Sequence, residues 1–224
     1  MVDANPVSLT QAGRLMRRAT LASMAVALAL IVAKAAAWLL TDSVAMLSSL
    51  VDSSLDLLSS VITFFAVRQA LVPADADHRF GHGKAEALAG VAQAGFIAAS
   101  AAAVLLTVSD RVLHPRPLQS EAIGIAVSFF AIVLTLALVW YQRRVLAQTG
   151  SIAVGADKAH YTTDLVSNLA VGAGLFLASR LNQPLIDLAV AVGVAFYLAM
   201  SAIGIARQAF DVLMDRELPD SERQ

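Results

Sequence analysis

The sequence contains no cysteine and few charged or aromatic residues. Its 224 residues include 15% Asp, Glu, Lys and Arg and 6% aromatic residues, against 58% hydrophobic residues. Without cysteine, disulfides, thiolate metal sites and cysteine nucleophiles are excluded, so a bound metal must use His, Asp, Glu, carbonyl or water ligands. Soluble domains carry about 25% charged residues, and the shortage of charge therefore indicates a membrane protein. The net charge of −1 argues against a nucleic-acid partner, which usually binds a basic stripe.

Six apolar runs divide the sequence into candidate membrane-spanning helices. Each run is near or above the roughly 20 residues needed to cross a hydrocarbon core. Arg14, Arg17 and Arg18 precede a first run of spanning length, so we expect a retained helix and not a cleaved signal peptide. The predicted spans are 19–40, 43–68, 84–109, 120–142, 153–179 and 184–207. We therefore predict an all-α membrane protein, a bundle of six transmembrane helices.

The distribution of basic residues predicts the orientation of this bundle, because cytoplasmic loops are enriched in Lys and Arg. With a cytoplasmic N-terminus, the outer segments hold only Arg111, Arg116 and Arg180, and Lys34 lies within the first span. The other twelve basic residues are cytoplasmic: Arg14, Arg17, Arg18, Arg68, Arg79, Lys84, Arg143, Arg144, Lys158, Arg207, Arg216 and Arg223. Both termini are therefore predicted to face the cytoplasm.

Two pairs of potential metal ligands stand inside the apolar runs. Asp52 and Asp56 lie in the second run, and His160 and Asp164 lie in the fifth. Residues four apart share one face of a helix, so each pair presents two ligands in one direction. An ionised Asp near the centre of a membrane helix costs about 2.5–3.5 kcal/mol on insertion scales. Such residues are therefore expected to have a function. Together the pairs supply the four ligands of a tetrahedral Zn²⁺-like ion.

The predicted topology brings these pairs to matching depths. At about 1.5 Å per residue, Asp52 and Asp56 lie roughly 14 and 20 Å below the outer face of the membrane. His160 and Asp164 lie roughly 10 and 16 Å from the inner face. In a core about 30 Å thick, Asp52 is then level with Asp164, and Asp56 with His160. One site with four ligands near mid-membrane is geometrically allowed.

The alternative is that each intramembrane Asp is satisfied locally. Lys34 could pair with one of them, and hydroxyls of the second run could donate hydrogen bonds: Ser48, Ser49, Ser53 and Ser54. Two pairs at identical spacing and matched depth favour the metal site over this alternative.

A second group of candidate ligands lies between the second and third runs. Asp75, His78 and His82 follow the spacing D-x2-H-x3-H, which suits a surface Zn²⁺ or Cd²⁺ site. Gly81 and Gly83 favour an irregular backbone here. A solvated loop with incidental histidines is the alternative, and spacing alone does not decide between them.

Three other titratable residues are not expected to bind metal. His114, flanked by prolines in an outer loop, is expected to be solvated. Glu86 and Asp157 lie near cytoplasmic ends of predicted spans, where water or a basic partner would explain them.

Four segments together resemble the cation diffusion facilitator family, in particular its bacterial zinc and iron exporters. They are DSVAMLSSLVDSSLD at 42–56, HRFGHGKAEALA at 78–89, ADKAHYTTD at 156–164 and LMDRELPD at 213–220. The resemblance implies a six-helix domain that exchanges a divalent cation for protons and works as a homodimer. Compact loops and the absent signal peptide suggest a bacterial inner membrane.

The resemblance also implies roles for individual residues. Asp52, Asp56, His160 and Asp164 would form the transport site. Asp75, His78 and His82 would form a second metal site, and Lys84 and Asp215 would make a charge pair between the loop and the last helix.

The sequence departs from the family pattern at its C-terminal end. Members usually continue after the sixth helix into a cytoplasmic αβ domain, whereas this sequence stops at DRELPDSERQ. We therefore assign residues 1–210 to the transmembrane domain and 211–224 to the start of a linker to an absent cytoplasmic domain.

Carboxylate and imidazole ligands must be deprotonated to bind metal, so protons and metal compete for the site. Three carboxylates and one imidazole suit Zn²⁺ and Cd²⁺ and also accept Fe²⁺, Co²⁺ or Mn²⁺. By analogy with the family we expect Zn²⁺ export, with Cd²⁺ as a fellow substrate and Fe²⁺ as a further candidate. A metalloenzyme is disfavoured because the H-E-x-x-H motif is absent. A membrane sensor or scaffold that binds metal without transporting it is the remaining alternative.

Overall fold

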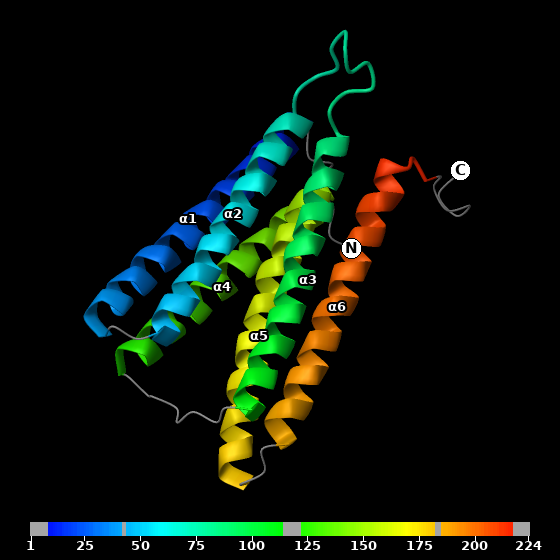
Figure 1. The fold of residues 1–224 in the computed structure, drawn as a ribbon. Helices are drawn as coiled ribbons and strands as arrows, with labels where there is room; N and C mark the ends of the chain where they lie inside the picture. Colours follow the sequence, from blue (N-terminus) through cyan, green and yellow to red (C-terminus); the bar gives the residue numbers. More distant parts are fainter. Residues whose placement is uncertain (1–8, 42–43, 114–121, 182–184, 217–224) are drawn as a thin grey trace, which may run out of the picture.

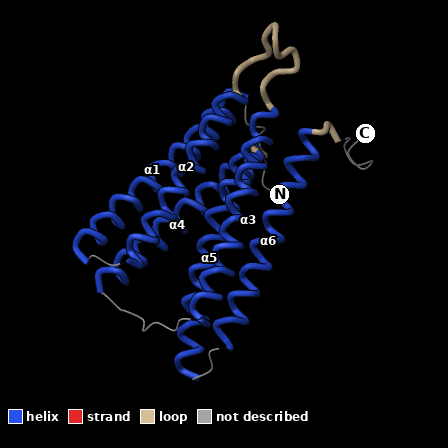
Figure 2. Tube along the Cα trace, viewed as in Figure 1, coloured by secondary structure: helices blue, strands red, loops and turns tan. Residues whose placement is uncertain are grey.

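The computed structural model describes residues 9–41, 44–113, 122–181 and 185–216, and every regular element in these ranges is an α-helix (Figures 1 and 2). The predicted all-α class is therefore confirmed. The helices are α1 (Leu9–Thr41), α2 (Val44–Ala70), α3 (Lys84–Leu113), α4 (Ala122–Thr149), α5 (Ile152–Leu181) and α6 (Leu185–Leu213).

Successive helices run in opposite directions, so one end of the bundle collects the start of every odd-numbered helix and the end of every even-numbered one (Figure 1). Side-chain contacts support this arrangement: Lys84 at the start of α3 bonds Asp215 just after α6, and Glu86 bonds Ser151 before α5. We call this end, which carries residues 71–83, the loop end. The predicted breaks at 114–117 and 182–184, with His114 and Arg116, lie outside the described residues.

Several helices continue beyond the predicted spans at the loop end. Helix α1 begins at Leu9, before the span predicted from 19; α4 runs to Thr149, beyond 142; and α6 runs to Leu213, beyond 207. Apolar contacts explain the first extension, because Met16 and Ala19 pack into a buried cluster with Val67. Gly150 ends α4: its φ is 63°, and its N–H donates to the carbonyl of Leu146 at 2.9 Å.

Among the residues that the structure describes, five helical stretches are long and apolar enough to cross a membrane. The qualifying stretches are Thr10–Thr41, Ser49–Ala70, Lys84–Leu106, Ala126–Thr149 and Ala189–Leu213. Helix α5 carries Asp157, His160 and Asp164, and it contacts each of the other five helices. Because α5 lies at the centre of the bundle, its polar residues contact other helices and not lipid. Polar groups inside membranes usually face the bundle interior in this way.

Small side chains fill the interior of the bundle, and large apolar ones cover its outside. Leu39, Leu40 and Phe129 are exposed over about two thirds or more of their surface (74, 75 and 68%). Many of the buried residues are alanines: Ala19, Ala27, Ala37, Ala87, Ala89, Ala94, Ala153, Ala156, Ala191, Ala195, Ala202 and Ala209. Small residues let helices approach closely in a membrane, where lipid covers the apolar exterior.

Candidate metal centres

Helices α2 and α5 bring three of the four predicted intramembrane ligands together. His160 Nε2 lies 3.2 Å from Oδ1 of Asp56 and 3.3 Å from Oδ2 of Asp164. One ligand atom from each residue lies within 4.8 Å of the others. The His160–Asp164 contact follows from their four-residue spacing on one helix, whereas the contact with Asp56 requires the packing of α5 against α2.

The geometry of this group, which we call the membrane cluster, suits a metal ion. In a tetrahedron with bonds of about 2.0–2.1 Å, neighbouring ligand atoms are roughly 3.3 Å apart, close to the two distances observed. His160 is nearly buried, with 4% of its side chain exposed, while Asp56 and Asp164 retain 21% and 25%. His160 Nδ1 is a buried atom with no hydrogen-bond partner. Asp164 Oδ2, the oxygen nearest His160, is likewise buried without a hydrogen-bond partner. A buried imidazole beside two partly exposed carboxylates can accept an ion from the adjoining space.

Asp52 lies outside the membrane cluster. It is exposed and sits one turn from Asp56 on α2, and its ligand atoms are not among those that converge on His160. The two i, i+4 pairs therefore do not meet as a complete set of four in this structure. The role of Asp52 as the fourth ligand stays a prediction.

A cavity of about 290 Å³ adjoins the cluster on the side away from the loop end. Helices α1, α2, α4 and α5 line it: Leu30, Lys34, Ser49, Asp56, Ser128, Ala131, Ile132, Thr135, Tyr161, Asp164, Leu165 and Asn168. Both carboxylates of the cluster reach this space, which can hold a hydrated ion.

On the loop-end side of the cluster, a buried polar network surrounds Asp157. This residue is 1% exposed. Its Oδ2 accepts hydrogen bonds from Ser23 Oγ at 2.6 Å and Gln142 Nε2 at 2.7 Å, and its Oδ1 accepts one from Gln93 Nε2 at 3.2 Å. The expectation that water or a basic partner explains Asp157 is wrong. Donors from α1, α3 and α4 satisfy it because the carboxyl points into the bundle.

Further hydroxyl groups extend this network to α2. Gln93 accepts a hydrogen bond from Ser59 at 2.7 Å and donates one to Thr63 at 2.8 Å. Tyr161 shares a hydrogen bond of 2.9 Å with Ser60. Since these side chains are buried, the network closes the space between the membrane cluster and the loop end.

Glu86 is likewise held by uncharged partners. Its Oε2 accepts hydrogen bonds from Ser151 Oγ at 2.5 Å and from the N–H of Ala153 at 3.3 Å. A carboxylate that accepts from the first turn of α5 stabilises the positive end of that helix. The role of Glu86 in this structure is therefore to attach α3 to the start of α5.

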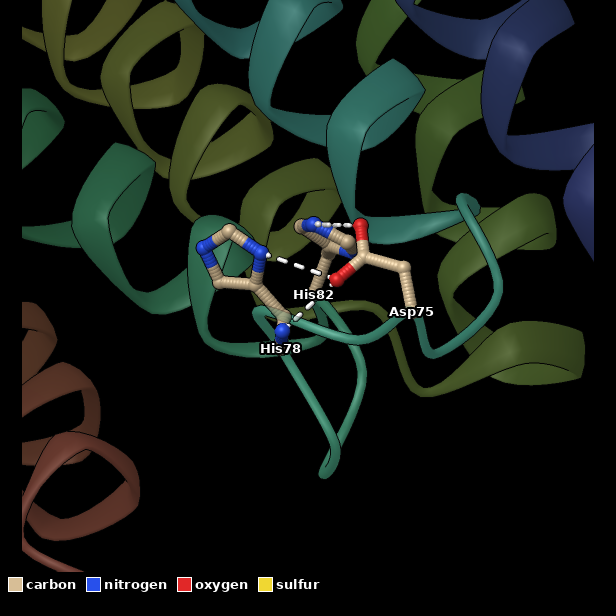
Figure 3. A group of neighbouring side chains, drawn as sticks. All are labelled: Asp75, His78 and His82. Carbon is tan, nitrogen blue, oxygen red and sulfur yellow. Dashed lines mark hydrogen bonds and ion pairs between the residues drawn. The ribbon is translucent and has the colours of Figure 1, made fainter.

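The predicted loop ligands also converge, as Figure 3 shows. Asp75 Oδ1 lies 3.2 Å from His78 Nδ1, and Asp75 Oδ2 lies 3.6 Å from His82 Nε2. The two imidazole rings are 4.4 Å apart between centroids. Gly81 has a φ of 79°, which agrees with the irregular backbone expected there. We call Asp75, His78 and His82 the loop site.

Two features of the loop site fit a bound cation. The backbone N–H of His78 donates to Asp75 Oδ1 at 2.6 Å and holds the pKa of this carboxyl below its usual range, so Asp75 is an anion at neutral pH. His82 is 93% buried, and its Nδ1 has no hydrogen-bond partner. An ionised carboxylate beside two imidazoles, one with a spare nitrogen, is a suitable donor set for Zn²⁺.

The charge pair implied by the family resemblance is present. Lys84 Nζ lies 2.9 Å from Asp215 Oδ2 and donates to the carbonyl of Leu213 at 3.1 Å. Both side chains are more than half exposed, so the pair links α3 to the end of α6 without contributing much stability.

Sequence reasoning missed the roles of Asp157 and Tyr161. A signal was available, because Asp157, His160, Tyr161 and Asp164 follow the i, i+3, i+4, i+7 pattern of one helix face. That periodicity places all four residues on the side of α5 that faces the bundle.

The membrane-spanning helices enclose carboxylate and imidazole ligands beside a cavity. This arrangement is typical of membrane proteins that bind or transport metal cations. Comparison with known families identifies the chain more closely. Residues 20–214 match the family described as the cation efflux transmembrane domain. The chain belongs to the cation efflux family: it is a cation efflux transporter and not an enzyme.

Bacterial cation-efflux pumps are similar over most of the chain. The cation-efflux pump FieF of Shewanella oneidensis is 47% identical over 206 residues, which cover 92% of this chain and 69% of the relative. The pumps of the same name from Klebsiella pneumoniae and Salmonella arizonae are 44% and 42% identical over 212 residues, or 95% of this chain and 70% of each relative. With these relatives and its apolar helices, the chain is a multi-pass protein of the bacterial inner membrane.

Proposed function

We propose that this chain exports Zn²⁺ from the cytoplasm in exchange for protons, with Cd²⁺ as a fellow substrate and Fe²⁺ as a further candidate. The observation that carries the proposal is the convergence of Asp56, His160 and Asp164 from two helices at the wall of an internal cavity. Oxygen and imidazole ligands without thiolate suit these borderline ions.

The same ligands provide for exchange with protons. Carboxylate and imidazole bind metal only when deprotonated, so metal entry displaces protons and proton entry displaces metal. His160 Nε2, which would carry the proton, lies 3.2 and 3.3 Å from the oxygens of Asp56 and Asp164. The metal-free cluster can therefore hold a proton at the position where the metal was bound.

Transport requires the cluster to be reached from each side of the membrane in turn. We propose that six helices span the bilayer and that the loop end is cytoplasmic, with both termini on that side. The cavity then lies on the outer side of the cluster, and the Asp157 network closes the inner side. The conformation described corresponds to outward release, and the inner network would part to admit the metal.

Three further assignments belong to this proposal. The loop site binds a second zinc ion on the cytoplasmic side and orders the segment between α2 and α3. Asp52 joins the membrane cluster as the fourth ligand when metal is bound. The protein acts as a homodimer, with residues 1–210 as the transmembrane domain and 211–224 as the start of a linker to a cytoplasmic domain.

Zinc flux into proteoliposomes containing a trapped zinc dye, with and without a pH gradient, tests the proposal. Wild type should transport zinc in a gradient-dependent manner, and Asp56→Asn should not. Asp211→Asn is a matched control, because Asp211 forms an exposed ion pair with Arg216 outside the cluster. Zinc binding without flux in the wild type would instead support a metal-binding sensor or scaffold. Flux that survives in Asp56→Asn would exclude the membrane cluster as the transport site.

A further inference from the structure

Lys34 places a positive charge in the cavity that adjoins the membrane cluster. It lies on α1 within the apolar stretch Thr10–Thr41 and lines the same cavity as Asp56 and Asp164. A lysine inside a membrane span is costly, so it is expected to have a specific role and identifiable partners.

The partners of Lys34 are uncharged. Its ammonium group donates to Ser53 Oγ at 2.6 Å and to the backbone carbonyl of Ser49 at 3.1 Å. Both acceptors lie on α2, and Ser53 stands between Asp52 and Asp56 in the sequence. The ammonium is therefore held beside the carboxylates without forming a direct ion pair with Asp56 or Asp164 in this structure.

The charges near the cavity balance when a divalent ion is present. Asp52, Asp56 and Asp164 carry three negative charges when ionised, and a divalent metal leaves one of them uncompensated. Lys34 supplies the remaining positive charge. Charges interact more strongly inside a protein than in water. A lysine that lines the same cavity as Asp56 and Asp164 therefore both completes the charge balance and repels the metal.

We propose that Lys34 acts as a tethered cation that weakens metal binding at the membrane cluster and so permits release. A site on a transport pathway must bind its ion strongly enough to capture it and weakly enough to let it leave. Three acidic residues without a counter-charge would hold a divalent ion too tightly. This inference rests on the proposed function, because it assigns Lys34 a part in transport at the same cluster.

A purely structural role for Lys34 makes a different prediction. The hydrogen bonds to Ser53 and Ser49 connect α1 to α2 and would order the helix that carries Asp56. If this connection were the whole role, its loss would loosen the site and weaken metal binding. The two roles therefore predict effects of opposite sign when the charge is removed.

The experiment compares Lys34→Met, Lys34→Gln, Lys34→Arg and Ser53→Ala, each in the 224-residue chain carrying His82→Ala to disable the loop site. Zn²⁺ affinity is measured by competition with a chelating dye in lipid nanodiscs, and Zn²⁺ efflux in proteoliposomes. Ser53→Ala is the matched control: it removes the 2.6 Å hydrogen bond but leaves the charge in place. Lys34→Gln provides a second neutral variant should Lys34→Met fail to fold.

The neutral variants should bind Zn²⁺ about tenfold or more tightly, because a unit charge near a divalent ion is removed from a site of low dielectric. Their efflux turnover should fall, since release becomes slower. Lys34→Arg, which keeps the charge, should remain near wild-type affinity, and Ser53→Ala should not tighten binding.

Neutral variants with unchanged or weaker Zn²⁺ affinity would overturn the role of Lys34 while leaving the transport site intact. Tighter binding in Ser53→Ala as well would overturn it too, because that variant retains the charge. Adding Asp56→Asn to the His82→Ala protein separates the two proposals. If that substitution left Zn²⁺ binding unchanged, the proposed function itself would fail, and this inference with it.

Discussion

His160 on α5 and Asp56 on α2 are 104 positions apart in the sequence and meet with Nε2 3.2 Å from Oδ1. Rotation or sliding of either helix would separate these atoms. The contact therefore depends on how α2 packs against α5. The His160–Asp164 contact, in contrast, follows from the geometry of one helix.

The two aspartates of α2 should contribute unequally to metal binding. Asp56 contacts His160, whereas Asp52 is exposed and must move toward the cluster to join it. We expect Asp56→Asn to lower Zn²⁺ affinity about a hundredfold and Asp52→Asn about tenfold, within the range found when metal-site groups are removed. Calorimetric titration in the His82→Ala protein measures both. A larger loss in Asp52→Asn than in Asp56→Asn would contradict the ranking.

Metal preference should depend on the imidazole of His160. Replacement by Asp gives a cluster of oxygen ligands alone, which favours Mn²⁺ relative to Zn²⁺. We expect His160→Asp to reduce the ratio of Zn²⁺ to Mn²⁺ transport about tenfold or more, judged against general ligand preferences. Competition flux in proteoliposomes gives the ratio. Unchanged zinc selectivity in His160→Asp would show that His160 does not set it.

The buried carboxyl of Asp157 should be required for stability. Ser23, Gln142 and Gln93 all donate hydrogen bonds to the carboxyl oxygens of Asp157. In Asp157→Asn, one of these oxygens becomes an NH₂ group, which is a donor and cannot accept them. Leaving a buried polar group unsatisfied costs about 1–3 kcal/mol. We expect a lower apparent melting temperature in detergent, with a larger decrease than in Ser23→Ala.

Ser23→Ala is the control for Asp157→Asn because it removes one donor and leaves the carboxyl with its other two. A melting temperature unchanged in Asp157→Asn would show that the network does not hold the bundle closed on this side.

Loss of metal from the loop site on acidification should not arise from protonation of Asp75. Because the pKa of Asp75 is lowered in the folded protein, the stabilisation from its ionised form is present above the ordinary Asp value of about 3.9 and is lost below it. Protons compete with metal for imidazole ligands, which bind only when neutral. In protein carrying Asp56→Asn, Zn²⁺ binding should therefore weaken on acidification while Asp75 is still ionised, above about pH 3.9.

Asp75→Asn provides the comparison for the loop site, since the amide oxygen can still accept from the N–H of His78. We expect lower Zn²⁺ affinity at every pH, with the same dependence on pH above about pH 3.9. A pH dependence that disappears with Asp75→Asn would assign the titration to the carboxyl.

Much of the architecture could be predicted from local patterns. Apolar runs predicted the helices, and the four-residue spacing placed His160 beside Asp164, because these properties depend on neighbouring residues along one helix. Depth arithmetic also predicted that Asp56 and His160 lie level. The helix ends were less predictable: α1 begins ten residues before the predicted span, since packing at Met16 stabilises its first turns.

The sequence by itself determined that this protein is a helical membrane bundle with acidic and histidine ligands in its spans, because composition and periodicity are properties of the chain. The tertiary structure alone decided the direction in which each ligand points. It left Asp52 outside the cluster, buried Asp157 among amides and hydroxyls, and placed Lys34 against Ser53. The physical reason is that rotation of a helix about its axis is set by close packing of small side chains with its neighbours, and small residues on several faces permit more than one rotation.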